Sequence, residues 1–261
     1  TLIATHCEKE EIIKANKEKY IEKFGKDLSV IYHPLIRSAE ACYASSSEAV
    51  ELAHRYNARL HLLHLSTAKE LSLLSDGPVE EKQITAEVCV HHLYFDDNDY
   101  AQYGNLIKWN PAIKTAADRI ALMKATVSGR IDVVATDHAP HAAFEKEREF
   151  ELAPFGITGL ETSFGLVNTY LVKPGHIDHA RLVELMAIRP RDILRIPQVT
   201  LEAGSPADIT VVDPDLVWTV EAQDMCSKSL NSPFIGYKLT GKPTDVVCKG
   251  KLTLEAGNVC V

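Results

Sequence analysis

A predicted buried strand near the middle of the chain ends in residues that can bind a metal and carry protons. The apolar run 131–135 is followed by Asp137, His138 and His141, and such a run is typical of a buried strand. A carboxylate at a strand end can bind a divalent metal and also accept a proton, and imidazole is a common metal ligand. Taken alone, the segment could equally be a solvated turn that Pro140 favours.

The same arrangement occurs twice more. Residues 2–5 form an apolar run that ends at His6, and a second run, 59–65, contains His64 near its end. A single histidine on a strand is more often a core or surface residue than a ligand. Two strand-end histidines and a strand-end aspartate together indicate a functional site, because the active-site residues of parallel α/β folds lie at the carboxyl ends of the strands. This donor set favours zinc or a similar divalent metal.

Alternating strands and helices are predicted to position these residues. Apolar runs predict strands at 2–5, 59–65, 85–90 and 131–135. Helical patterns are predicted at 9–24, 46–56, 68–74, 115–128, 160–171, 180–187 and 191–196. Pro34 predicts a loop at 32–38, and Pro190 predicts a break between the last two helices. Thr115 and Asp118 have the spacing of a capping box.

The character of the sequence changes after Pro197. Short β-type runs at 209–212, 217–220 and 245–248 are separated by Gly, Pro and Asp residues. The sequence therefore predicts two parts, an α/β part at 1–197 and a β-rich part at 198–261.

Five motifs resemble those of the dihydroorotases, a family within the amidohydrolase superfamily of metal-dependent (β/α)8 barrels. The motifs follow one another along almost the whole chain, and they are residues 4–8 (ATHCE), 63–67 (LHLST), 109–111 (WNP), 135–141 (ATDHAPH) and 153–161 (APFGITGLE). The resemblance implies an α/β TIM barrel of the amidohydrolase type. The chain would supply its C-terminal part, strands 5–8, and a segment of the small flanking β-sandwich.

The resemblance also implies metal-ligand motifs that do not occur in this sequence. Members of the family carry a His-x-His pair on strand 1 and a bridging ligand, often a carboxylated lysine, on strand 4. No His-x-His pair precedes His6. We therefore expect strands 1–4 to be missing from the chain and the chain alone to be inactive.

The resemblance assigns roles to seven residues. The implied metal ligands, in a site that holds two zinc ions in the complete enzyme, are His6, His64 and Asp137. Asp137 is also the implied catalytic residue, which takes a proton from a metal-activated water and passes it to the leaving nitrogen. The implied substrate-binding residues are Asn110, His141, Phe155 and Gly156. The reaction would be the reversible hydrolysis of the cyclic amide of dihydroorotate to N-carbamoyl-aspartate, a step of pyrimidine biosynthesis.

Several neighbouring residues receive simpler interpretations. Cys7 is expected to pack on the strand face opposite to His6, and His91 and His92 are expected to be structural. His138 is expected to orient Asp137 as a neighbour of the metal site. Asn110 could also belong to an ordinary Asn-Pro turn.

Composition limits the kinds of partner. The net charge is −8, with 36 acidic and 28 basic residues among 261, which argues against a nucleic-acid surface. The sequence has no apolar run of membrane-spanning length, so no membrane partner is expected. Six scattered cysteines without Cys-x-x-Cys spacing suggest a reducing, cytoplasmic location. A small-molecule substrate is the expected partner, and a homodimer is compatible with this interpretation.

Two alternatives stay open. One is another cyclic amidohydrolase, such as a hydantoinase or an allantoinase, although these usually differ in the motifs at 135–141 and 153–161. The other is a non-catalytic dihydroorotase-like scaffold protein. Such proteins typically lose ligands, whereas this chain keeps those that its own motifs should supply.

Overall fold

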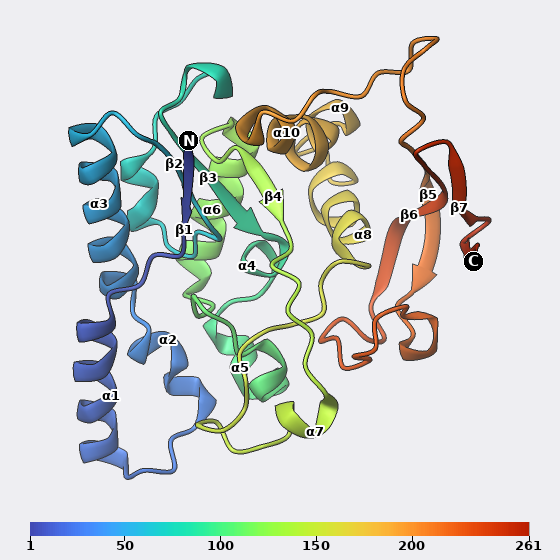
Figure 1. The fold of residues 1–261 in the computed structure, drawn as a ribbon. Coiled ribbons are helices and arrows are strands. Elements are labelled where there is room, and N and C mark those ends of the chain that lie inside the picture. Colours follow the sequence, from blue (N-terminus) through green and yellow to red (C-terminus); the bar gives the residue numbers. More distant parts are fainter. Residues whose placement is uncertain (261) are drawn as a thin grey trace. The chain divides into compact units, whose positions relative to one another are not determined.

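The computed structural model describes residues 1–260, which form two compact units. The first unit comprises residues 1–161 and 222–233, and the second comprises 162–221 and the segment from Phe234 onward. The first contains a parallel sheet with the strand order β1-β2-β3-β4, and the second contains an antiparallel sheet with the order β5-β6-β7-β8 (Figure 1). The predicted combination of a parallel α/β part with a later β-rich part is confirmed.

The parallel strands lie in register over three to four residues each. Their bounds are β1 Leu2–Thr5, β2 Arg59–Leu62, β3 Ile84–Cys89 and β4 Val133–Ala135. Thr5 pairs with Leu62, and Cys89 pairs with Ala135. β1 and β2 therefore end at one level and β3 and β4 at another, three residues further along β3. The residues that follow β1, β2 and β4 all leave the sheet at its carboxyl-terminal edge.

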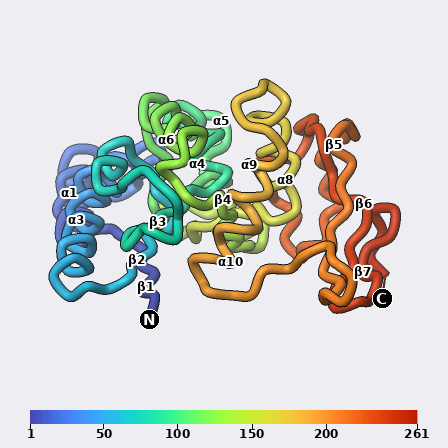
Figure 2. The backbone as a smooth tube through the Cα atoms, turned by 90° about the horizontal axis from the view of Figure 1, so that it is seen from above, coloured from blue at the N-terminus to red at the C-terminus, as the bar shows by residue number. Residues whose placement is uncertain are grey.

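The first unit contains seven α-helices among its described residues. Their bounds are α1 Glu10–Phe24, α2 His33–Ile36, α3 Ala39–Arg55, α4 Val90–Tyr94, α5 Tyr100–Tyr103, α6 Ala116–Ser128 and α7 Ala143–Lys146. α3 packs against β2, and α4 packs against β3 and α6 (Figures 1 and 2). α6 begins at the predicted capping box, in which the Thr115 side chain accepts from the Asp118 N–H and the Asp118 side chain accepts from the Thr115 N–H.

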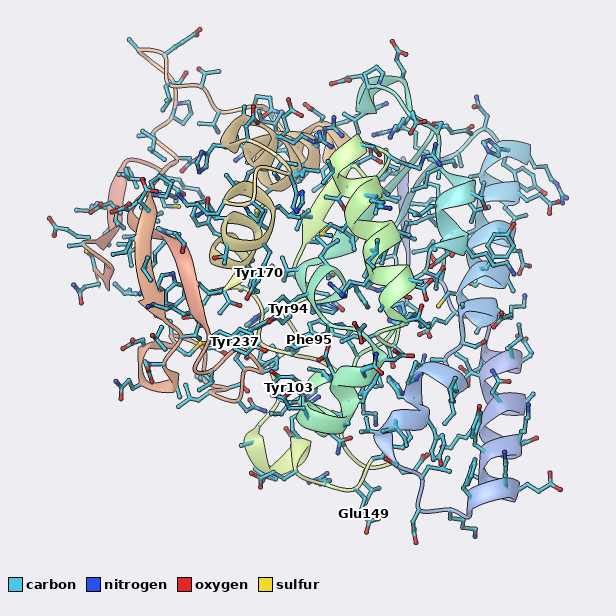
Figure 3. The ribbon with its side chains drawn as sticks, turned by 180° about the vertical axis from the view of Figure 1, so that it is seen from behind. Tyr94, Phe95, Tyr103, Glu149, Tyr170 and Tyr237 are labelled. Atoms are coloured by element: carbon cyan, nitrogen blue, oxygen red, sulfur yellow. The ribbon has the colours of Figure 1, made fainter. Side chains whose placement is uncertain are left out.

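The core of the first unit lies where the strands meet these helices. Leu62 on β2 and Ala86, Val88 and Cys89 on β3 are fully buried. Both faces of β3 are therefore covered, as in parallel sheets, although Thr85 and Glu87 on one of these faces are polar. Below the sheet, the Phe95 ring lies 4.9 Å from that of Tyr94 and 5.2 Å from that of Tyr103 (Figure 3). This cluster supports the segment that connects β3 to α6.

The second unit joins a group of helices to the antiparallel sheet. Its elements are α8 Ser163–Val167, α9 His179–Val183, α10 Arg189–Leu194, β5 Ile209–Thr219, β6 Lys238–Cys248, β7 Lys251–Glu255 and β8 Asn258–Val259. α8 packs against β6 at Gly165, where an added Cβ would meet Leu239 Cδ1 at 3.1 Å. The buried Asn168 side chain donates to the carbonyl oxygens of Pro214 and Thr240, which fixes the helices on the sheet.

Several predicted boundaries were wrong. Residues 33–36 are helical rather than loop, because Pro34 lies in the first turn, where its missing N–H costs no hydrogen bond. α3 begins at Ala39 instead of 46, since the Ser38 side chain caps it by accepting from the Ala41 N–H. The segment 69–73 is a 3-10 helix.

The last helical region also differs from the prediction. A π-helical segment, Glu184–Ile188, joins α9 to α10, and Pro190 lies in the first turn of α10 rather than at a break. Residues 209–219 form one strand that carries irregularities in its pairing, where two separate runs were expected. The strand bends at these points and continues, so the short apolar runs were parts of a longer element.

Candidate metal and substrate site

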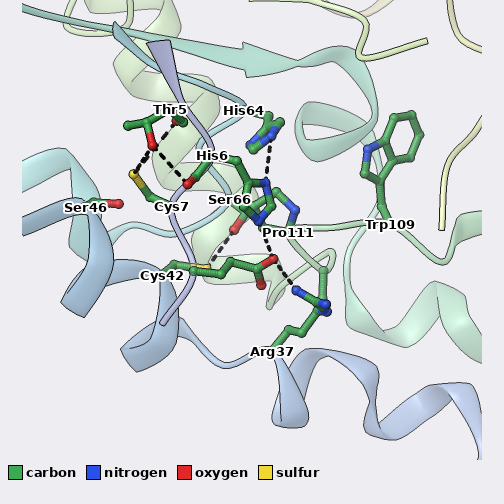
Figure 4. A network of polar contacts seen from close by, with 12 residues as sticks. Thr5, His6, Cys7, Arg37, Cys42, Ser46, His64, Ser66, Trp109 and Pro111 are labelled. Carbon is green, nitrogen blue, oxygen red and sulfur yellow. Dashed lines mark hydrogen bonds and ion pairs between the residues drawn. The ribbon is translucent and has the colours of Figure 1, made fainter. Parts of the chain in front are cut away.

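Two histidines from neighbouring strands face each other directly beyond the parallel sheet. His6 follows β1 and His64 follows β2, and Nδ1 of His6 lies 3.1 Å from Nε2 of His64 (Figure 4). His64 has a φ of 35°, a left-handed conformation that turns the chain sharply after the strand. Burial lowers the pKa of His64, and the neighbouring His6 lowers it further. The lowered pKa favours the neutral imidazole, the form of histidine that can bind a metal.

A carboxylate and a guanidinium orient His6 from its other side. His6 Nε2 donates to Glu8 Oε2 at 2.9 Å, and Arg37 Nη1 donates to the same oxygen at 2.5 Å (Figure 4). Burial would raise the pKa of Glu8, but the hydrogen bond from His6 and the charge of Arg37 outweigh it and leave the pKa below its usual value. Glu8 therefore orients the His6 ring so that Nδ1 faces His64.

Asp137 follows β4 and is held by an indole. The Trp109 Nε1–H donates to Asp137 Oδ2 at 2.7 Å. The Trp109 ring is stacked on the His91 ring, with centroids 3.2 Å apart and an angle of 18° between the planes. Asp137 has a φ of 44°, so the chain turns here as it does at His64. The carboxylate is thus fixed at the same edge of the sheet as the two histidines.

All seven residues singled out from the sequence line one open cavity of about 550 Å³. They are His6, His64, Asn110, Asp137, His141, Phe155 and Gly156. Asn110 is 8% exposed, and its buried Oδ1 has no hydrogen-bond partner within residues 1–260. An unpaired buried amide oxygen costs free energy, so Asn110 is suited to accept a hydrogen bond from a bound molecule rather than to stabilise a turn.

The far wall of the cavity comes from the loop between β4 and α8. His141 lies with Nε2 3.1 Å from the Phe155 carbonyl oxygen, which joins the two ends of the loop. The Phe155 ring is 54% exposed and lies 5.9 Å from the Arg37 guanidinium. Gly156 has a φ of +136°, and an added Cβ would lie 2.5 Å from the Ala139 carbonyl oxygen. Only glycine allows the loop to approach the segment after β4 this closely.

The donor set fits a divalent metal. Two ligand nitrogens bound to one tetrahedral ion at about 2.0–2.1 Å lie roughly 3.3 Å apart, close to the 3.1 Å between His6 and His64. The contact of His6 with Glu8 has the form of a carboxylate that orients a metal-ligating imidazole. The site thus offers two imidazole nitrogens, with the Asp137 carboxylate on the same cavity.

A second group of possible ligands lies in the core. Cys89, His91 and His92 are buried, and each offers one atom that could bind a metal. These three atoms lie within 4.8 Å of one another. His92 Nε2 lies 3.1 Å from the Pro111 carbonyl oxygen, and burial lowers the pKa of His92 to about 3. With His91 stacked on Trp109, these contacts agree with the structural role expected for the two histidines.

Sequence reasoning missed three residues of the site. Glu8 and Trp109 lay within the quoted motifs, but neither received a role, and Arg37 lay in a segment predicted to be a loop. His138 was expected to hold Asp137. In the structure its Nδ1 accepts from the backbone N–H groups of Gly159 and Leu160 instead, and Trp109 contacts Asp137.

Comparison with known sequences identifies a family. The model of the Amidohydrolase family matches residues 1–253. A dihydroorotase of Elusimicrobium minutum (strain Pei191) is 40% identical over 228 residues, which are 87% of this chain and 52% of that protein. A dihydroorotase of Bacillus subtilis (strain 168) is 39% identical over 210 residues, 80% of this chain and 49% of that protein. The chain spans about half the length of the curated relatives it matches.

Solved structures agree on the fold. An L-hydantoinase (dihydropyrimidinase) from Arthrobacter aurescens matches with a TM-score of 0.92 and 28% identity, over 100% of this chain and 58% of that one. A D-hydantoinase (dihydropyrimidinase) from Thermus sp. matches with a TM-score of 0.90 and 22% identity, with the same coverage. In the part of the chain that the structure describes, no helix is both long and apolar enough to cross a membrane.

Proposed function

Because the chain belongs to the amidohydrolase family, we propose that it is part of a dihydroorotase that reversibly hydrolyses the cyclic amide of dihydroorotate to N-carbamoyl-aspartate. Residues 1–197 would form strands 5–8 of a (β/α)8 barrel, and residues 198–261 a segment of the flanking β-sandwich. The observation that carries the proposal is the meeting of His6, His64 and Asp137 on one cavity. The 40% identity to dihydroorotases supports the choice of substrate.

In this proposal, His6, His64 and Asp137 bind zinc, of which the complete enzyme holds two ions. When bound, zinc supplies a Lewis acid for the amide carbonyl and lowers the pKa of a water molecule toward neutrality. Glu8 keeps the His6 ring oriented through Nε2. The Arg37 guanidinium in turn holds the Glu8 carboxylate charged.

Asp137 moves the proton. Its Oδ2 accepts from the Trp109 indole N–H and keeps a second lone pair that would bind the metal, so the other carboxylate oxygen is the one that accepts the proton of the attacking water. The same oxygen then donates that proton to the departing ring nitrogen, because a carboxyl that has served as general base can serve next as general acid. The indole contact keeps the carboxylate from rotating between the two steps.

The remaining residues bind the substrate. The unpaired Asn110 Oδ1 accepts from a ring N–H of the cyclic ureide, and His141 lies on the side of the substrate carboxylate. The exposed Phe155 ring and the backbone at Gly156 form the wall against which the ring lies. The substrate is a small molecule, and the cytoplasmic location and the homodimer remain predictions.

The test is a substrate comparison on the full-length protein. Ring opening of dihydroorotate, a 5-substituted hydantoin and allantoin should be measured side by side, in the presence of zinc. We expect turnover of dihydroorotate, and of N-carbamoyl-aspartate in the reverse direction, to exceed that of the other two by at least about tenfold in kcat/KM. Preferential turnover of the hydantoin would contradict the proposal.

A further inference from the structure

The loop that carries Phe155 and Gly156 has little regular structure to hold it. After α7 ends at Lys146, residues 147–158 form turns and irregular segments without a helix or a strand. Phe155 nevertheless has to keep its ring on the cavity, and Gly156 has to remain close to Ala139. Some other interaction must fix the backbone on both sides of Phe155.

Lys146 makes that interaction. Its side chain turns back under the loop, and Nζ donates to the carbonyl oxygens of Gly156 at 2.8 Å, Pro154 at 2.9 Å and Lys108 at 3.3 Å. Two of these carbonyls flank Phe155 directly. The three acceptors match the three N–H donors of an ammonium group.

The third acceptor connects the loop to another wall of the cavity. The Lys108 carbonyl oxygen also accepts from the Gly156 N–H at 3.0 Å. Lys108 immediately precedes Trp109 and Asn110, which contact Asp137 and line the cavity respectively. One amino group therefore ties the segment that carries Trp109 and Asn110 to the segment that carries Phe155.

This lysine is costly to bury, which argues for a specific role. Lys146 is 4% exposed, and none of the carboxylates in the described residues forms an ion pair with it. A buried amine without an opposite charge destabilises a fold unless its hydrogen bonds compensate. An apolar side chain would satisfy the packing alone, so the hydrogen bonds to the loop are the feature that requires a lysine.

A second buried lysine offers an internal comparison. The Lys108 side chain is 7% exposed, and its Nζ donates to the carbonyl oxygens of Phe150 and Ala153. These contacts fix the earlier part of the same loop, which does not line the cavity. The two lysines thus hold different halves of one loop, and only Lys146 holds the half that faces the site.

We propose that Lys146 is a positioning residue that fixes the substrate-binding wall at Phe155 and Gly156 and couples it to the Trp109–Asn110 segment. This inference rests on the proposed function for the identity of the substrate, but not for the action on the loop. Removing the amino group releases the wall while leaving His6, His64 and Asp137 in position. The loss should therefore fall on substrate binding and not on metal binding.

The test uses Lys146→Met in the full-length protein, with Lys124→Met as the matched control. Lys124 is an exposed lysine on α6, away from the cavity. We expect Lys146→Met to raise KM for dihydroorotate by about tenfold or more while kcat falls by less than about threefold. Bound zinc, measured by mass spectrometry, should equal that of the wild type. Lys124→Met should leave all three quantities unchanged.

A milder substitution keeps the test decisive if Lys146→Met does not fold. The amide of Lys146→Gln donates two hydrogen bonds where Met donates none, so its KM should lie between those of the wild type and Lys146→Met. Failure of Lys146→Gln to fold would overturn the inference, because it would give Lys146 a general role in the core. Equal KM values in the wild type and both variants would overturn it as well.

Hydrogen exchange separates this inference from the proposed function. In Lys146→Met, amides of residues 155–157 should exchange faster by about tenfold or more, whereas in Lys108→Met the acceleration should be centred on residues 150–153. This measurement needs no substrate. If the wild type proves inactive toward dihydroorotate but the two exchange patterns appear, only the proposed function fails. If exchange at 155–157 does not change, the role of Lys146 fails whatever the substrate.

Discussion

The indole N–H of Trp109 donates a 2.7 Å hydrogen bond to Oδ2 of Asp137, and the same indole ring is stacked on buried His91. Three residues from different parts of the first unit thus form a chain from the core to the cavity. A hydrogen bond to a carboxylate is worth roughly 1.5–3 kcal/mol. The orientation of Asp137 therefore depends on the indole of Trp109, which lines the same cavity.

Trp109→Phe tests this relationship. The variant keeps most of the stacking on His91 but loses the hydrogen bond, so we expect kcat to fall by about tenfold or more. The matched control is Trp218→Phe, which removes an indole donating to the Gly241 carbonyl in the antiparallel sheet. Steady-state kinetics on the full-length variants decides the matter, and equal kcat values for both would mean that Asp137 is held by other contacts.

Asp137→Asn should abolish turnover of dihydroorotate while the fold stays intact. The substitution removes a ligand charge and the proton carrier, but it retains an oxygen that can accept from Trp109. Circular dichroism and kinetics on the full-length protein provide the measurement. A variant with near wild-type kcat at pH 8 would show that Asp137 is not the catalytic residue.

Metal content should distinguish the two groups of histidines. His6→Ala and His64→Ala should each lower the zinc bound to the purified full-length protein, because each removes one of the facing nitrogens. His91→Ala should retain more zinc, since His91 contributes packing to Trp109. Elemental mass spectrometry on the three variants is the measurement. Equal zinc in all three variants would show that the metal does not bind at the His6–His64 pair.

Gly156→Ala should weaken substrate binding more than an equivalent change at Gly77. Both glycines have positive φ angles, +136° and +120°, but an added Cβ meets the Ala139 oxygen at 2.5 Å only at Gly156, and nothing lies within 4 Å at Gly77. The pair therefore separates a steric displacement of the loop from the cost of the backbone conformation. We expect KM to rise several-fold for Gly156→Ala alone, and similar KM values in both variants would exclude the displacement.

The burial of Lys146 predicts that the stability of the fold depends on pH. Burial lowers the pKa of Lys146 to about 7, with a further contribution from the charge of Lys108, whereas the unfolded value is about 10.4. Between these values the unfolded chain binds more protons than the folded one, so the contribution of Lys146 to the free energy of unfolding rises with pH, by up to about 1.4 kcal/mol per unit. Below about pH 7 the contribution levels off.

The measurement is the difference in unfolding free energy between the wild type and Lys146→Met from pH 6 to pH 10. We expect this difference to grow in favour of the wild type across the window, because the variant has no amine to titrate. A flat difference would show that the folded-state pKa of Lys146 is close to its ordinary value.

Much of the strand framework could be predicted from the sequence. β1 was predicted with its observed bounds, and β2, β3 and β4 within a few residues, because buried parallel strands appear as short apolar runs. The capping box at Thr115 was confirmed for a similar local reason. Prolines were misjudged at 34 and 190, since the sequence does not distinguish a proline that opens a helix from one that ends it.

The site was predictable as a set of positions but not as a set of contacts. Strand ends indicated where His6, His64 and Asp137 would emerge. The side chains that orient the site lie far away in the sequence. Trp109 is 28 positions from Asp137, and Arg37 is 29 positions from Glu8. No local pattern encodes such pairs. Lys146 was missed for a different reason, because a lysine in a charged segment is usually exposed.

The left-handed turns at His64 and Asp137 have a consequence for any mutational survey of this protein. At these two positions the backbone itself selects among amino acids, and it disfavours valine, isoleucine and threonine before their chemistry can be assayed. Asparagine adopts this conformation readily and glycine does so without strain. A saturation library at either position will therefore mix folding defects with lost activity, most of all at the β-branched substitutions, and the asparagine and glycine variants will carry the least backbone strain.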